Sequence, residues 1–170
     1  MTEIRFYHLQ RITLEAALPR LLEKTLARDW RAVVMARSQD RVEALNALLW
    51  TYNREGFLPH GSARDGNAEH QPIWLTEKDE NPNGATVLFL TDGATSRNLD
   101  AFTLCWELFD GNDADALAAA RGRWRAGLET GHQLTYWQQN ARGGWEKKAA
   151  AAEASDGTAA DAPGAPPETP

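Results

Sequence analysis

An arginine lies within an apolar helical stripe in the last third of this chain. In the segment 113–128, a turn of about 100° per residue places Leu117, Arg121 and Trp124 within an arc of roughly 60°. A guanidinium that leaves water needs an anion, and an indole beside it offers an apolar wall and a cation–π surface. The grouping fits a ligand that ends in a carboxylate with apolar groups next to it. The simpler alternative, which this helix by itself slightly favours, is an arginine that reaches solvent or pairs with an internal acid.

Two aromatic residues form a second candidate site. On the helix predicted for 39–52, Trp50 lies about 80–100° away from the apolar stripe, next to polar residues. Phe57 follows in a loop whose freedom is limited by Pro59. Large aromatic side chains on a restrained loop are typical anchors for a protein partner. The alternative is a loop that packs onto its own domain and covers Trp50.

Motifs for enzyme chemistry are weak in this sequence. No glycine-rich phosphate loop is present, and the turn after the first predicted strand is Gln10-Arg11-Ile12, so its backbone cannot approach a pyrophosphate closely. The four histidines are scattered without metal-ligand spacing, so we expect no metal site and no cofactor. Asp92 and the acidic run 77–80 leave one catalytic alternative, a degenerate nucleotide-binding or nucleic-acid-processing enzyme that uses a metal.

Composition divides the chain into two parts. Residues 149–170 hold four acids, no base and no large apolar residue, which predicts a disordered, acidic, Ala/Pro-rich tail. Of the net charge of −6, this tail carries −4, which leaves −2 for a single folded domain over 1–148. A nearly neutral body argues against direct binding of single-stranded DNA through Arg and Trp side chains, a third possible function. No stretch has the length and hydropathy of a membrane span, and we expect a cytoplasmic protein.

Strands and helices alternate along the predicted domain, which indicates an α/β fold with a mainly parallel sheet covered by helices on both faces, a three-layer α/β/α sandwich. Thr13 and Ser38 are the expected caps of the first two helices, and Pro19 is a weak point inside the first. Cys105 is expected to be a buried, inert thiol in a helix. The predicted strands are 4–9, 31–36, 72–75, 86–91 and an edge strand at 132–138, and the predicted helices are 13–28, 39–52, 99–109 and 113–128.

Several of these segments together resemble the chi subunit family of bacterial DNA polymerase III. They are Leu49-Trp50 with Phe57-Leu58-Pro59-His60 after six residues, the opening Phe6-Tyr7-x-Leu9, and the late Ala120-Arg121-x-Arg123-Trp124. The resemblance runs from about residue 3 to residue 145. It implies a nucleotide-binding-like fold without a phosphate-binding loop, and a non-catalytic adaptor between the clamp loader and single-stranded-DNA-binding protein, which contacts DNA mostly indirectly and has no membrane partner.

The resemblance also implies roles for the two candidate sites. Arg121, Trp124 and Leu117 correspond to the pocket for the acidic C-terminal tail of single-stranded-DNA-binding protein, which ends in Pro-Phe. Trp50 and Phe57 correspond to the surface for the psi subunit or a helicase-like partner. The family commonly has Tyr at the position of Trp124 and often a basic residue at that of Leu117, so this chain offers fewer charges to an acidic tail.

Overall fold

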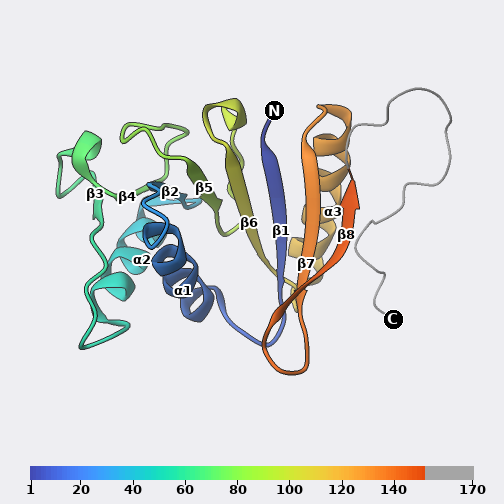
Figure 1. Ribbon diagram of the computed structural model, residues 1–170, viewed down its shortest axis with the longest axis horizontal. Helices are drawn as coiled ribbons and strands as arrows, with labels where there is room; N and C mark the ends of the chain where they lie inside the picture. Colours follow the sequence, from blue (N-terminus) through green and yellow to red (C-terminus); the bar gives the residue numbers. More distant parts are fainter. Residues whose placement is uncertain (152–170) are drawn as a thin grey trace, which may run out of the picture.

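The computed structural model describes residues 1–151, and residues 152–170 lie outside the described part (Figure 1). One eight-stranded sheet runs in the order β3-β4-β2-β5-β6-β1-β7-β8, and its strand pairs are parallel except β7 with β8. The strands are β1 (Glu3–Leu9), β2 (Ala32–Met35), β3 (Gly61–Ser62), β4 (Ile73–Thr76), β5 (Val87–Leu90), β6 (Leu104–Asp110), β7 (Gln133–Gln139) and β8 (Trp145–Ala151). The helices are α1 (Leu14–Leu26), α2 (Gln39–Thr51) and α3 (Ala114–Glu129), with short 3-10 turns at Ala68–His70 and Leu99–Ala101. No helix among residues 1–151 is long and apolar enough to cross a membrane.

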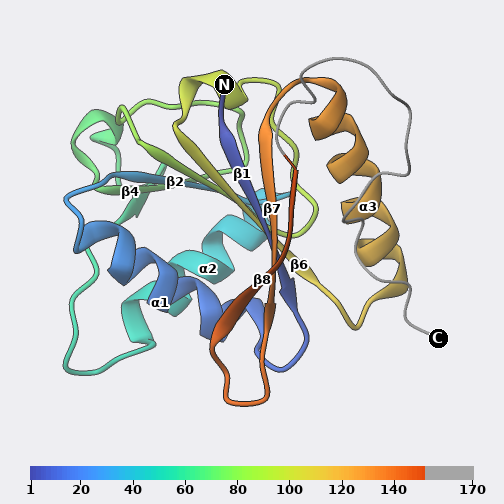
Figure 2. The same cartoon turned by 45° about the vertical axis from the view of Figure 1, so that its right-hand side comes forward.

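The two faces of the sheet are covered separately. Helices α1 and α2 pack on one face, and α3 packs on the other (Figure 2). Strand β1 contributes apolar side chains to both faces of the sheet: Ile4 and Phe6 face α3, whereas Tyr7 and Leu9 face α1 and α2. Strands β2 and β5 are buried at every position, as their uninterrupted apolar sequences predict for central parallel strands.

The caps predicted for the first two helices, Thr13 and Ser38, are confirmed. The side chains of Thr13, Ser38 and Asp113 precede α1, α2 and α3, and each accepts hydrogen bonds from backbone N–H groups of the first turn. Helix α1 runs through Pro19, which is buried, so the expected weak point does not end the helix.

The helix predicted for 99–109 is wrong. Its second half is strand β6, which pairs with β5 on one side and β1 on the other, at the centre of the sheet. A central parallel strand is apolar on both faces, so its sequence has no alternation that distinguishes it from a buried helix. Cys105 therefore lies in a strand, although its predicted burial is confirmed, and burial raises the pKa of its thiol well above the ordinary value.

The edge strand predicted for 132–138 is not at the edge. Strand β7 lies between β1 and β8, and β8 forms the antiparallel edge of the sheet. Strand β8 ends at Ala151, so three alanines that the prediction assigned to the tail belong to the sheet. The prediction of disorder for the rest of the tail concerns residues outside the described part.

An ion pair beneath α3 joins this helix to the centre of the sheet. The guanidinium of Arg123 donates its Nε–H to the carboxylate of Glu107 on β6, which is buried. Burial raises the pKa of Glu107 to about 7, although the charge and hydrogen bond of Arg123 act in the opposite direction. The pair fixes how α3 lies on the sheet, and burying the carboxylate has an energetic cost.

We predict that the cost of burying the ionised Glu107 carboxylate lowers the free energy of unfolding as the pH rises from about 4.5 to about 7. In the unfolded state the carboxyl of Glu107 has its ordinary pKa of 4.5 and has released its proton in that pH range, whereas the folded state keeps the proton. The substitution Glu107→Gln removes this titration, so the variant gains stability relative to wild type by an amount on the order of 3 kcal/mol between pH 4.5 and pH 8. Urea unfolding of both proteins at several pH values measures the difference, with Glu129→Gln on α3 as a control that keeps the wild-type slope. Parallel stability profiles for Glu107→Gln and wild type would disprove the prediction.

Candidate functional site: two surfaces at opposite ends of the sheet

Arg121 lies at the flank of the buried side of α3. The buried line of this helix runs through Leu117, Ala120, Trp124 and Gly127, and Arg121, next to that line, is partly exposed. The structure thus brings together the three residues that the sequence grouped on this helix. The predicted stripe is nevertheless shifted, since the arginine borders the buried surface and does not lie at its centre.

Trp124 is a core residue. Its side chain is 1% exposed, and its ring contacts those of Phe6 and Tyr136 edge-on, with centroids 5.2 and 6.4 Å apart. Leu117 is also buried, at 7% exposure. Both residues therefore support the helix beneath Arg121, and they offer almost no surface to a ligand.

His8 and Tyr136 complete the surroundings of Arg121. The Tyr136 hydroxyl and His8 Nδ1 share a hydrogen bond under α3. Burial lowers the pKa of His8 and raises that of Tyr136 to about 12, and the charge of Arg121 lowers both. His8 is therefore neutral at pH 7, and Arg121 carries the positive charge of the group. We call Arg121, together with the buried residues next to it, the α3 surface; these buried residues are Leu117, Trp124, His8 and Tyr136.

Sequence reasoning missed the contribution of His8 and Tyr136. The signal for His8 was its place in β1, two residues after Phe6 and four after Ile4, which puts all three on one face of the strand. Gly111 makes room for the imidazole, since a Cβ atom at this position would lie 1.7 Å from His8 Nε2. Only the parallel pairing of β1 with β7 brings Tyr136 beside it.

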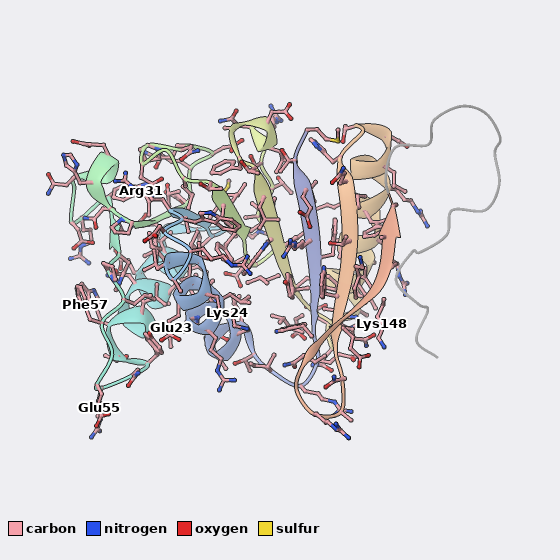
Figure 3. The ribbon with its side chains drawn as sticks, viewed as in Figure 1. Glu23, Lys24, Arg31, Glu55, Phe57 and Lys148 are labelled. Carbon is pink, nitrogen blue, oxygen red and sulfur yellow. The ribbon has the colours of Figure 1, made fainter. Side chains whose placement is uncertain are left out.

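Trp50 and Phe57 form an exposed aromatic surface at the other end of the sheet. Their rings lie 6.2 Å apart between centroids, and 52% of Trp50 and 74% of Phe57 is exposed. The loop does pack onto its own domain, through Leu58 and His60, which are buried and joined by a hydrogen bond from His60 Nδ1 to the Leu58 carbonyl. That packing holds Phe57 outward (Figure 3). The loop is thus anchored, while the rings of Phe57 and Trp50 lie in contact and stay accessible.

A cleft of about 1100 Å³ lies at the carboxyl ends of the parallel strands, where open α/β sheets usually bind ligands. The first turns of α1, α2 and α3 all border it. Its lining carries both acidic and basic side chains, and Arg41 donates to Asp92 at 2.9 Å and to Glu15 at 3.1 Å. This arrangement does not favour a polyanionic ligand such as a nucleotide.

The acids of the catalytic alternative are engaged in local structure. Asp79 accepts hydrogen bonds from Ser96 and from the backbone of Arg97, and Glu80 accepts from Trp74 and Thr76. Asp92 is paired with Arg41. Within residues 1–151, no three His, Cys, Asp or Glu side chains gather as a metal-binding group.

Comparison with known proteins identifies the family. The family described as "DNA polymerase III chi subunit, HolC" matches residues 1–135, which include β1, α3, Trp50, Phe57 and Arg121. A curated relative, the probable DNA polymerase III subunit chi of Rickettsia prowazekii (strain Madrid E), is 37% identical over 90 residues, which are 53% of this chain and 54% of that protein. The chain thus spans about half the length of the curated relative that it matches. From the extent of the family match, the chain belongs to the DNA polymerase III chi subunit family.

Proposed function

We propose that this protein is a non-catalytic adaptor of the DNA polymerase III holoenzyme, which links the clamp-loader complex to the C-terminal tail of single-stranded-DNA-binding protein. The observation that carries the proposal is the separation of two chemically different surfaces. The α3 surface lies near the β8 edge of the sheet, and the Trp50/Phe57 surface lies near its β3 edge (Figure 1). An adaptor needs two sites that can be occupied at once, and this arrangement supplies them. The helices on both faces of the sheet support the three-layer, nucleotide-binding-like architecture that the family resemblance implies.

The α3 surface suits a terminal carboxylate. Arg121 is partly exposed, and its charge acts on the buried side chains of His8 and Tyr136, so its guanidinium is less hydrated than that of a fully exposed arginine. A guanidinium donates two parallel hydrogen bonds to a carboxylate, and charge-assisted bonds of this kind are stronger than neutral ones. We assign Arg121 as the residue that binds the carboxylate, with Trp124 and Leu117 as the buried residues that hold its helix in place.

The Trp50/Phe57 surface suits a folded protein partner. Met1, Trp50 and Phe57 are the exposed large apolar side chains among the described residues, and the latter two are in contact. Adjacent aromatic rings on an anchored loop lose little conformational entropy on binding and bury a large apolar area. We assign this surface to the psi subunit of the clamp loader or to a helicase-like partner.

Arg121→Ala is expected to weaken binding of an acidic peptide that ends in Pro-Phe by about 10- to 100-fold, because a hydrogen bond to a charged group contributes about 1.5–3 kcal/mol. Arg125→Ala, one turn further along α3 and exposed, is the matched control for loss of charge alone. The same peptide with a C-terminal amide tests the carboxylate directly. Fluorescence anisotropy at two salt concentrations measures all of these affinities. A folded Arg121→Ala protein that binds the peptide as tightly as wild type would exclude the assigned site.

Phe57→Ala is expected to release the clamp-loader partner while leaving peptide binding at the α3 surface unchanged. Truncating a central aromatic anchor costs about 2 kcal/mol or more, which is roughly 30-fold in affinity. Glu55→Ala alters an exposed neighbour in the same loop and serves as the control (Figure 3). Co-purification with the psi subunit or the helicase-like protein, quantified beside peptide binding, gives both readouts. Equal partner recovery with Phe57→Ala and Glu55→Ala would contradict the assignment, as would a parallel loss of peptide binding.

A further inference from the structure

A pocket separate from the cleft lies on the flank of α3 opposite Arg121. Its volume is about 560 Å³, within the range of about 300–1,000 Å³ that is usual for small-molecule sites. The C-terminal half of α3 and the loop at 95–100 form its walls, and the α3 face of β1, β5 and β6 forms its floor. This end of α3 lies near the N-terminus of the chain (Figure 1). The residues of the α3 surface do not line this pocket, so it is distinct from the proposed peptide site.

Most of the pocket wall is apolar. Ile4, Phe6 and Cys105 form its floor, and all three side chains are buried. On the α3 side, Ala126 and Gly127 are small, so they leave space between the helix and the sheet. Such a pocket favours a ligand with a compact body that can lose its contact with water, held in place by a few polar groups.

The polar groups of the pocket include the Glu107–Arg123 ion pair, which has hydrogen-bonding capacity left. Glu107 Oε1 accepts the Nε–H of Arg123, whereas no group within residues 1–151 donates a hydrogen bond to Glu107 Oε2. Oε2 is not among the fully enclosed polar atoms that lack a partner, so it keeps contact with the pocket, although the side chain is only 6% exposed. Burial raises the pKa of Glu107 to about 7, so the contact with Arg123 does not offset the lost hydration of the carboxylate. A ligand that donates a hydrogen bond to Oε2 would supply what the protein lacks there.

The ion pair also determines the chemistry of this ligand. Because the two charges neutralise one another, Glu107 would repel an anion and Arg123 would repel a cation, which favours a neutral ligand. A carboxylate oxygen accepts and a guanidinium donates, so the matching edge has an N–H group beside a carbonyl oxygen. Open-chain secondary amides are trans and direct these two groups to opposite sides, whereas a ring holds the amide cis. The lactam rings of thymine, uracil and guanine present this edge on a flat, neutral body.

We infer that this pocket binds the lactam edge of a nucleobase, with the ring N–H donating to Glu107 Oε2 and the neighbouring carbonyl oxygen accepting from an Nη group of Arg123. The flat ring lies against the apolar floor formed by Ile4, Phe6 and Cys105. A free nucleoside and an unstacked base of a single strand share this edge, and the single strand reaches the pocket without the cost of opening a duplex. The inference goes beyond the proposed adaptor function and does not depend on it.

The experiment titrates the full chain with thymidine at pH 8, above the pKa of about 7 of Glu107, so that its carboxylate is ionised. The control ligand is 3-methylthymidine, in which a methyl group replaces the hydrogen of the ring N–H. The backbone amide NMR signals of Thr95, Cys105 and Ala126 report binding at the pocket. A short oligothymidylate is the second arm. A higher affinity per base than that of thymidine identifies a single strand as the source of the base, and an equal affinity identifies the free nucleoside.

Two variants test the assigned residues. In Glu107→Gln the amide oxygen faces the donor on Arg123, so the NH₂ group faces the pocket and meets the N–H of the ligand, donor against donor. Ala126→Leu fills the pocket from the α3 side. Ala118→Leu, also exposed on α3 but outside the pocket, is its matched control.

We expect thymidine to shift the three signals, and we expect the methylated ligand and Glu107→Gln each to weaken binding by about 10- to 100-fold, the effect of one hydrogen bond to a charged group. Ala126→Leu abolishes the shifts, whereas Ala118→Leu retains them. Absence of shifts in the wild-type protein, or equal binding of thymidine and 3-methylthymidine, would overturn the inference. Thymidine binding by a protein that fails to bind the acidic Pro-Phe peptide would refute the proposed function alone.

Discussion

The packing of α3 onto the sheet is the contact on which the proposed peptide site at Arg121 depends. Trp124 lies against Phe6 and Tyr136, and Arg123 reaches Glu107 in the neighbouring strand. The apolar contact supplies stabilising burial, whereas the ion pair specifies the position of the helix at an energetic cost, because a carboxylate in this environment is poorly solvated. The apolar contact and the ion pair together determine the position of Arg121. A shift of the helix by one turn would move its charge away from His8 and Tyr136.

The parallel sheet separates the two surfaces and connects them rigidly. Strands β2, β5, β6 and β1 are buried on both faces and lie between the α2 end, with Trp50 and Phe57, and the α3 end, with Arg121. Close packing on both faces of a sheet resists deformation. Two partners bound at opposite ends would be held at a fixed separation and would not compete for space. The cleft at the carboxyl ends of the strands contains the ion pairs of Arg41 with Asp92 and Glu15.

Patterns within single elements predicted much of this architecture. The caps Thr13 and Ser38, the apolar strands β2 and β5, and the amphipathic α3 were all found, because local hydrogen bonding and one buried face determine them. Strand β6 was mistaken for a helix since burial on both sides removes the periodic signal, and β8 was missed because its alanines look like the low-complexity segment that follows. The exposure of Phe57 was left open, as it depends on Leu58 and His60 anchoring the loop.

The sequence by itself determined the chemistry of the two sites: a cation beside an indole on one helix, and two aromatic residues at the end of another. These depend only on residue type and helical spacing. Tertiary structure decided what each residue does there. It buried Trp124 as support, left Arg121 at the border of the core, and brought His8 and Tyr136 from strands 128 residues apart to its side. Such assignments require the order of strands in the sheet, which is set by long-range packing of whole elements and by no local pattern.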